Sequence, residues 1–203
     1  MRFFRSPLLA RYLIRKGIWK GSDKNAIYLT FDDGPNPEVT PFVLSVLRKY
    51  KIKATFFCVG NNVKNYPEVY GQILEEGHRV GNHTMFHENG IKTANHAYIE
   101  SVENASNYID SDLFRPPYGK VSPTQFKTLV KTLKKKVVFW TWISNDWDKT
   151  LASSEIILKA KSIRGGDILV FHDSLKAQKN LTESLEIIIQ MLQKRNFHFK
   201  NNF

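Results

Sequence analysis

Short apolar segments alternate with helical segments along most of this chain, and this alternation restricts the fold more than any other feature. The candidate strands are apolar at nearly every position, so both of their faces are expected to be buried. Buried strands separated by helices are typical of a parallel sheet that helices cover. We expect strands at residues 27–31, 54–59, 79–82, 113–115, 137–142, 168–171 and, with the weakest pattern, 197–199. Helical periodicity is present at residues 43–51, 69–77, 98–109, 123–133, 153–163 and 182–193.

The alternation alone does not distinguish a barrel from an open, doubly wound sheet. Polar residues favour the barrel, because clusters of them directly follow many of the strands, as functional groups do in (β/α) barrels. A length of 203 residues with 42% hydrophobic residues suits one domain of α/β class. The clusters are Asp32-Asp33-Gly34, Asn82-His83, Arg115-Pro116-Pro117-Tyr118, Ser144-Asn145-Asp146-Trp147 and His172-Asp173.

The chain is basic, with 30 Lys and Arg residues against 19 Asp and Glu residues. Residues 1–24 carry seven basic residues and one acid, and residues 120–136 carry six basic residues and no acid. The remainder is nearly neutral. We therefore treat residues 1–24 as a basic extension of a domain that spans residues 25–203. The two basic patches are either solvated surface or peripheral contacts with an anionic membrane or cell wall. Nucleic acid is not an expected partner, because no base-stacking motif accompanies the patches.

The sequence leaves the compartment open between the cytoplasm and a membrane surface. It contains neither an apolar stretch of about 20 residues nor a convincing signal peptide, because Arg11 interrupts the apolar segment near the start. Leu8, Leu9, Tyr12 and Leu13 fall at helical spacing and predict a short basic amphipathic helix over the domain's own core or on a membrane. The single cysteine, Cys58, excludes an internal disulfide and a multi-cysteine zinc site.

Two motifs predict a catalytic metal site. Asp32 and Asp33 end an apolar strand and point to different sides, so one can bind a metal while the other faces the substrate as a base. His83 and His87 are four residues apart, which on a helical turn places both imidazoles on one face. One carboxylate with two imidazoles leaves a coordination position open, as in catalytic zinc sites.

Three further groups suit acid–base chemistry. Arg115 is a permanent cation that can pair with Asp32, and the rigid loop after it presents a backbone N–H of Tyr118 to a developing oxyanion. His172 follows an apolar strand. The unperturbed pKa of a histidine, about 6.5, suits proton donation near neutral pH, and Asp146 is the candidate carboxylate partner. Trp147 offers an apolar surface for a sugar, whereas Trp140 and Trp142 are expected in the core.

In this order along the chain, the motifs resemble those of the polysaccharide deacetylase family (the NodB-homology domain, carbohydrate esterase family four). The resemblance covers the chain from about Ile27 to the C-terminus. It implies a distorted (β/α) barrel with seven or eight parallel strands that hydrolyses N-acetyl groups of N-acetylglucosamine-containing glycans of the peptidoglycan or chitin type. It also implies one divalent metal ion, usually Zn²⁺, with Co²⁺, Ni²⁺ or Mn²⁺ as alternatives. The matching segments are Thr30-Phe31-Asp32-Asp33-Gly34-Pro35, His83-Thr84-Met85-Phe86-His87, Arg115-Pro116-Pro117-Tyr118-Gly119 and His172.

Carried over residue by residue, the resemblance assigns a role to each group. Asp33, His83 and His87 would hold the metal. Asp32 would be the general base, oriented by Arg115. His172 would be the general acid, tuned by Asp146. The substrate and its oxyanion would meet the loop of Pro117 and Tyr118, and also Trp147.

The fourth motif departs from the family, which commonly has a second Asp where this chain has Ile143. This departure puts the acid side of the site or the choice of substrate in doubt. Two other functions therefore remain open, the hydrolysis of a small non-sugar amide and a non-catalytic glycan-binding module. We expect the protein to be a monomer.

Overall fold

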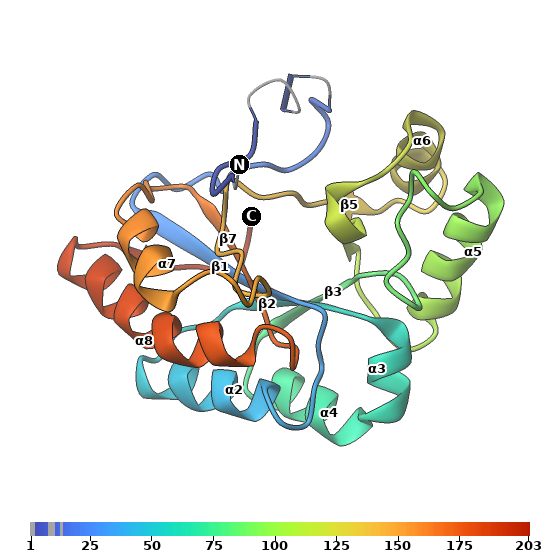
Figure 1. Ribbon diagram of the computed structural model, residues 1–203. Coiled ribbons are helices and arrows are strands. Elements are labelled where there is room, and N and C mark those ends of the chain that lie inside the picture. Colours follow the sequence, from blue (N-terminus) through green and yellow to red (C-terminus); the bar gives the residue numbers. More distant parts are fainter. Residues whose placement is uncertain (1–2, 8–10, 13) are drawn as a thin grey trace.

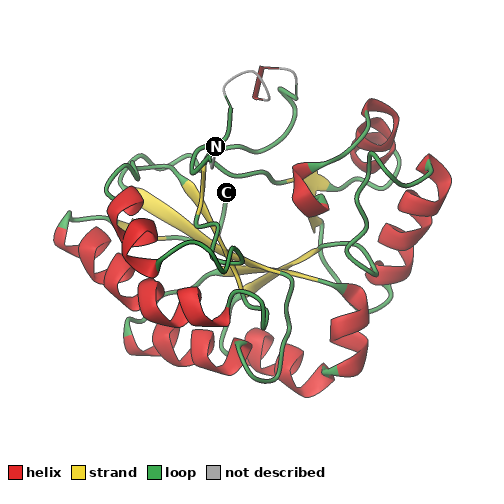
Figure 2. Cartoon of the chain, viewed as in Figure 1, coloured by secondary structure: helices red, strands yellow, loops and turns green. Residues whose placement is uncertain are grey.

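The computed structural model describes residues 3–7, 11–12 and 14–203. Its strands form one parallel sheet in the order β5-β4-β3-β2-β1-β7-β6, with β8 paired to β1 outside that path. The sheet is curled and helices surround it (Figures 1 and 2), which confirms the predicted distorted barrel. The strands are β1 (Ala26–Asp32), β2 (Thr55–Cys58), β3 (Arg79–Asn82), β4 (Leu113–Phe114), β5 (Lys136–Val137), β6 (Trp142–Ile143), β7 (Ile168–His172) and β8 (His198–Phe199).

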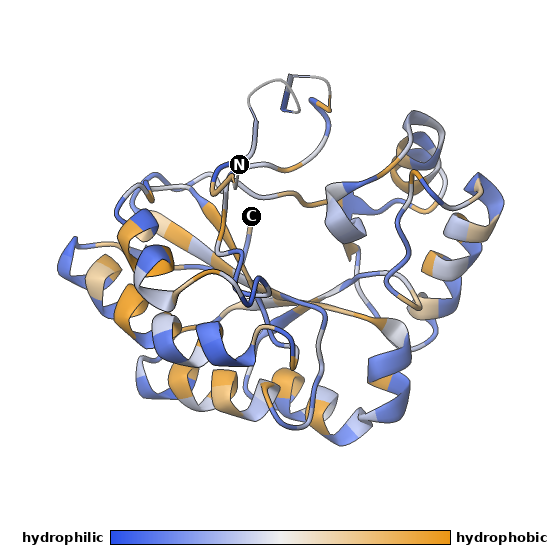
Figure 3. Ribbon diagram, in the orientation of Figure 1, coloured by the Kyte–Doolittle hydropathy of each residue, from blue (hydrophilic) through white to orange (hydrophobic). Residues whose placement is uncertain are grey.

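Helices follow most of the strands and lie on the outside of the sheet (Figure 1). Helix α8 shows the reason, because its apolar residues recur every three or four positions and form one buried face. Figure 3 shows this alternation of apolar and hydrophilic residues around α2 and α8. The helices are α2 (Thr40–Lys49), α3 (Gly60–Asn65), α4 (Pro67–Glu75), α5 (Asn95–Ser106), α6 (Pro123–Lys131), α7 (Ser153–Ala160) and α8 (Gln178–Lys194), with a 3₁₀ turn, η1 (Pro117–Gly119).

Strand β1 lies at the centre and sets the position of the site. All seven of its residues are buried, because β2 and β7 pair with its two edges and helices cover the sheet. Asp32, its last residue, is in register with Phe57 of β2 and His172 of β7. Since the strands are parallel, their carboxyl ends share one edge of the barrel, and the polar clusters that follow them come together there.

The strand expected at residues 137–142 is wrong as a single element. The structure has two short strands there, β5 and β6, which lie at opposite ends of the sheet. Residues 138–141 connect the two strands. Val138 N–H still donates to Phe114 of β4, and Thr141 N–H donates to Ile168 of β7, so the segment passes from one end of the sheet to the other. The expected core position of both tryptophans is consequently right only for Trp142, which is fully buried. Trp140 is partly exposed and lines a cavity.

Two pieces of the N-terminal segment lie in the opening between β5 and β6. Ile18 forms a parallel bridge with Val138, beside β5, and Arg5 forms an antiparallel bridge with Trp142 of β6. Figure 1 shows this segment in blue at the top of the view, between the α5 and α6 side and the α7 side. These residues therefore hydrogen-bond to the sheet, and the domain boundary at residue 24 stays a prediction.

Three further expectations from the sequence concern the N-terminal helix, membrane-spanning segments and Cys58. Of the amphipathic helix expected near the start, Leu8, Leu9 and Leu13 lie outside the described residues. No helix among the described residues has the length and apolar character that crossing a bilayer requires. Cys58 is buried and unpaired, and burial raises the pKa of its thiol well above its ordinary value.

Candidate active site

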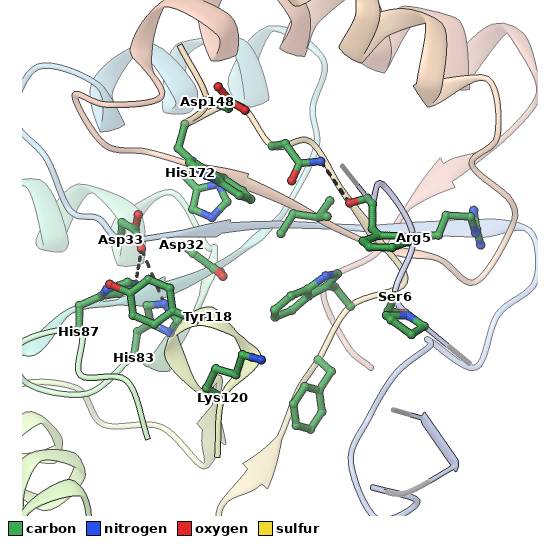
Figure 4. A pocket seen from close by; sticks show the side chains of 18 of the residues that line it. Arg5, Ser6, Asp32, Asp33, His83, His87, Tyr118, Lys120, Asp148 and His172 are labelled. Carbon is green, nitrogen blue, oxygen red and sulfur yellow. Dashed lines mark hydrogen bonds and ion pairs between the residues drawn. The ribbon is translucent and has the colours of Figure 1, made fainter. Parts of the chain in front are cut away.

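The three predicted metal ligands lie together at the carboxyl ends of β1 and β3. One donor atom from each of Asp33, His83 and His87 lies within 4.8 Å of the other two. The Asp33 Oδ1 atom is 3.1 Å from Nε2 of His87 and 3.7 Å from Nε2 of His83. Figure 4 shows both imidazoles directed at the Asp33 carboxylate.

The two histidines are not on a helical turn, so that expectation is wrong. Residues 83–87 form an irregular loop after β3, in which Thr84 and His87 have φ angles of 66° and 60°. The Asn82 side chain holds this loop by accepting a hydrogen bond from the backbone N–H of Thr84 at 2.9 Å. The rings of His83 and His87 nevertheless approach to 5.0 Å between centroids. The loop conformation, rather than helical geometry, therefore brings the imidazoles together.

The protonation of His83 suits a metal ligand. Its Nδ1 is 2.7 Å from the backbone carbonyl of Arg115, which can only accept, so Nδ1 carries the proton and Nε2 has a free lone pair. Burial, against the charge of Asp32, lowers the pKa of His83 to about 4 and keeps the ring neutral at neutral pH. Hydrogen bonds from the second ring nitrogen orient metal-binding histidines in this way.

Asp33 is held in a strained backbone conformation, with a φ of 79°. The Asn62 side chain donates to its backbone carbonyl at 2.7 Å, and Val59 N–H donates to the carbonyl of Gly34 at 2.9 Å. Among the described residues, no backbone N–H or hydroxyl donates to the buried Oδ1 of Asp33, whose polar neighbours are the two imidazoles. An orphaned carboxylate oxygen beside two imidazole nitrogens fits a divalent cation, since O and N donors with an open position are the set that catalytic zinc uses.

Asp32 and Arg115 form a buried ion pair beside this cluster. The Nη1 atom of Arg115 donates to Asp32 Oδ1 at 2.6 Å and to Thr30 Oγ1 at 2.7 Å. The guanidinium also donates to two backbone carbonyls near β5 and lies 4.0 Å from the centre of the Phe57 ring. Arg115 is 0% exposed, so every donor that it uses is fixed by the barrel interior. The structure thus contains the ion pair between Arg115 and Asp32, and the role of Arg115 in orienting the carboxylate stays a prediction.

His172 and Asp146 form the second predicted pair. Nδ1 of His172 is 2.7 Å from Asp146 Oδ1, and the backbone N–H of His172 donates to Oδ2 at 2.9 Å. Burial would lower the pKa of His172, but the charge and hydrogen bond of Asp146, with the charges of Asp33 and Asp32, raise it to about 9. The edge of Trp147 contacts the imidazole, with 4.7 Å between ring centroids.

The loop after β4 completes this end of the site. Tyr118 has a φ of 59° within η1, and its ring contacts His87 edge-on at 4.7 Å between centroids. Within this loop Pro117 is buried, whereas Tyr118 is 60% exposed. Figure 4 shows Tyr118 beside His87 and His83, with His172 on the other side of Asp32.

Asp173 is a site residue to which sequence reasoning gave no role. Its buried carboxylate accepts from Gly34 N–H at 3.1 Å and from Thr40 Oγ1 at 2.6 Å, and its own N–H donates to the carbonyl of Asp32 at 3.1 Å. Burial, with the charge of Asp33, raises its pKa to about 8. Asp173 thus ties the end of β7 to the turn that carries Asp33. The only signal in the sequence is its place directly after His172.

These groups share one cavity of about 840 Å³. Asp32, Asp33, His83, His87 and His172 line it, and so do Tyr118, Trp147, Trp140 and Ile143. Pro117, Arg115 and Asp146 support the cavity wall through the contacts described above. The predicted site residues thus form one continuous arrangement.

Comparisons with known proteins show which family this chain resembles. The polysaccharide deacetylase family model matches residues 20–138. A peptidoglycan-N-acetylglucosamine deacetylase of Bacillus cereus is 33% identical over 185 residues, which cover 88% of this chain and 86% of that protein. A chitooligosaccharide deacetylase of Bradyrhizobium sp. is 32% identical over 209 residues, covering 94% of each.

The fold is similar to that of the crystal structure of the Bc1960 peptidoglycan N-acetylglucosamine deacetylase, with a TM-score of 0.84 and 26% identity over 96% of this chain and 94% of that one. The family model covers more than half of the chain, and the sequence relatives cover most of it. The chain therefore belongs to the polysaccharide deacetylase family.

Proposed function

We propose that this protein is a metal-dependent deacetylase that hydrolyses N-acetyl groups of N-acetylglucosamine-containing glycans, as its relatives' names indicate for them. The observation that supports it best is the arrangement around Asp32. A three-ligand cluster lies on one side of this carboxylate and the His172–Asp146 pair on the other, all lining or supporting one cavity. Hydrolysis of an amide needs a base for water, a stabilised oxyanion and an acid for the leaving amine.

Asp33, His83 and His87 would hold the metal, which we propose to be Zn²⁺, with Co²⁺, Ni²⁺ or Mn²⁺ as alternatives. When bound, such an ion activates water and polarises a carbonyl oxygen. The neutral His83 ring and the unpartnered Asp33 oxygen support this role.

Asp32 is the proposed base. Arg115 occupies Oδ1 of this carboxylate, and the carboxylate lines the cavity, where its other oxygen can take a proton from water. The hydrogen bond from the guanidinium fixes the orientation of the carboxylate, so Arg115 would act on the reaction by positioning Asp32.

His172 is the proposed acid. Because Nδ1 faces Asp146, Nε2 is the atom that can reach the leaving nitrogen, and the pKa of about 9 keeps the ring protonated at neutral pH. The loop of Pro117 and Tyr118 would bind the substrate, with the Tyr118 backbone N–H donating to the oxyanion. Trp147, packed against His172, would contact the sugar ring.

Ile143 lines the cavity in place of the carboxylate that the family commonly has. It does not replace Asp146 as the partner of His172, because Asp146 makes both hydrogen bonds to that residue. We therefore expect His172 to act as the acid without a carboxylate at residue 143, where the cavity wall is apolar. The monomeric state and the peripheral contacts of the two basic patches stay predictions.

Metal content and acetate release from N-acetylglucosamine oligomers, measured for the wild type and for His83→Ala, test the proposal. We expect about one divalent ion per chain and acetate release from the wild type, with both lost in the variant. Bound metal without acetate would redirect the search to small amides. A folded protein that binds no supplied zinc would contradict the mechanism and favour a binding module.

A further inference from the structure

The cavity extends well beyond the catalytic groups, to the N-terminal segment. Phe3, Arg5, Ser6, Pro7 and Trp19 line its far side, and we call these five residues the N-terminal wall. In Figure 4, Arg5 and Ser6 lie across the cavity from the metal-ligand cluster, with the remaining lining side chains between them. The wall is remote in sequence from the five motifs, and none of the roles assigned above involves it.

Strand-like hydrogen bonds hold the wall in place. Ile143 N–H donates to the carbonyl of Phe4 at 3.0 Å, and Ser6 N–H donates to the carbonyl of Thr141 at 3.3 Å. The Asn145 side chain donates to the carbonyl of Phe3 at 3.2 Å. These bonds occupy the edge of β6 that no other strand covers among the described residues. Residues 3–6 thus take the place of a further barrel strand.

An ion pair between the half-buried Arg5 and the buried Asp167 fixes the same segment. The guanidinium of Arg5 makes two hydrogen bonds of 3.0 Å to the Asp167 carboxylate, which is fully buried. Because these donors are taken, Arg5 offers the cavity its aliphatic stem rather than a free charge. The pair is a clamp for the wall and not a binding site for an anion.

The surfaces that the wall presents are aromatic and apolar. Phe3 is 62% exposed, and the Asn145 side chain holds its backbone carbonyl. Trp19 stacks on Phe139 at 4.2 Å between ring centroids with an angle of 10° between the planes, and its Nε1 donates to Ile14. Trp140 lines the same cavity as Trp19 and the catalytic groups.

This surface suits a sugar ring. A pyranose has one face rich in C–H groups, which buries apolar area against a flat aromatic ring while its hydroxyls stay in water. The volume of about 840 Å³ lies towards the upper end of the roughly 300–1,000 Å³ that holds a drug-sized ligand. It is therefore larger than a single amino sugar at the catalytic groups needs.

We propose that the N-terminal wall is a second sugar-binding subsite, which takes a residue further along the same glycan chain than the one being deacetylated. This inference rests on the proposed function, because it assumes that the acetamide lies beside Asp32 and His172. The occupant is a pyranose of the substrate, since the wall is continuous with the catalytic cavity and carries no free charge. It follows that the enzyme prefers oligomers over the shortest substrate that it can use.

The test compares Phe3→Ala and Trp19→Ala with wild type on N-acetylglucosamine oligomers of one to six units. Tyr12→Ala is the matched control, because Tyr12 is an aromatic of the same segment that is 63% exposed and outside the cavity lining. We expect kcat/KM for the hexamer, divided by that for the shortest substrate used, to fall about tenfold in the two wall variants. The control should keep the wild-type ratio, and thermal unfolding should confirm that Trp19→Ala is folded.

An unchanged ratio in both wall variants, with acetate still released, overturns the subsite and leaves the deacetylase standing. If wild type releases no acetate from any oligomer, the proposed function fails, and calorimetric titration with the hexamer decides the subsite separately. Binding of the hexamer that weakens about tenfold in Phe3→Ala but not in Tyr12→Ala supports the subsite. Equal binding by all variants, or none by wild type, overturns it.

Discussion

Asp146 controls the charge of His172, and Asp146→Asn tests that control. Burial would lower the pKa of His172, but the charge and hydrogen bond of Asp146, together with the charges of Asp33 and Asp32, raise it to about 9. Asparagine has nearly the same shape but carries no charge. Its amide oxygen replaces only one of the two acceptors, so with the oxygen at Nδ1 the backbone N–H of His172 loses its hydrogen bond. The substitution therefore removes the charge and one backbone hydrogen bond, while Nδ1 keeps an acceptor.

The expected size of the effect follows from the pKa. Without the Asp146 charge, we expect the pKa of His172 to return to about 6.5. A fall from about 9 corresponds to about 3 kcal/mol. At pH 8 the protonated fraction then drops from about nine-tenths to about one-thirtieth, so acetate release should fall about 30-fold. At pH 6 the fall should be less than about twofold, because both forms are then mostly protonated.

The assay is acetate release from an N-acetylglucosamine oligomer between pH 5.5 and 10, with metal supplied. Asp110→Asn is the matched control, because it removes one carboxylate at an exposed position outside the site. We expect the alkaline limb of the profile to move down by about 2.5 pH units in Asp146→Asn alone. An alkaline limb at the wild-type pH in that variant would refute the assignment of His172 as an acid tuned by Asp146.

Three further predictions concern stability and reactivity. Arg115→Met leaves the Asp32 carboxylate buried without its cation and should lower the free energy of unfolding by about 3–5 kcal/mol; urea denaturation should show part of this loss recovered when Asp32→Asn is added. The pKa of Asp173 is raised to about 8 in the folded state. Between about pH 4 and 8 the folded state therefore binds one more proton than the unfolded state. The stability that this group contributes falls as pH rises through that window. Asp173→Asn should flatten that fall in denaturation curves, and a parallel slope in both proteins would contradict the buried neutral carboxyl. Cys58 should react with a thiol reagent only after unfolding, because it is buried and its pKa is raised; rapid labelling of the native protein would show that β2 opens.

Local patterns were sufficient for the elements whose neighbours in sequence are also their neighbours in space. The strand at residues 79–82 was predicted with its observed bounds, β3 (Arg79–Asn82). The end of α4 was also predicted, because Gly77 adopts a φ of 73° and closes that helix, as glycine does after a last helical turn. Both features depend on residues within one or two turns of each other.

Patterns failed where a distant segment decides the conformation. Residues 137–142 have the composition of one strand, but they are divided because β4 pairs with their start and β7 with their end. His83 and His87 have helical spacing, yet the Asn82 side chain and the Arg115 carbonyl fix them in a loop. Neither partner can be read from the spacing itself.

The kinds of chemistry were therefore readable from the chain, because a strand end, a turn and a pair of ligands each leave a local trace. The assembly of the site was not, because it joins residues far apart in sequence. Arg115 and Asp32 are 83 positions apart, and Phe3 reaches the cavity only through pairing with residues 141–145. Such contacts depend on the packing of the whole barrel. The free energy gained when distant strands and helices pack together, rather than any local preference, determines where each side chain lies.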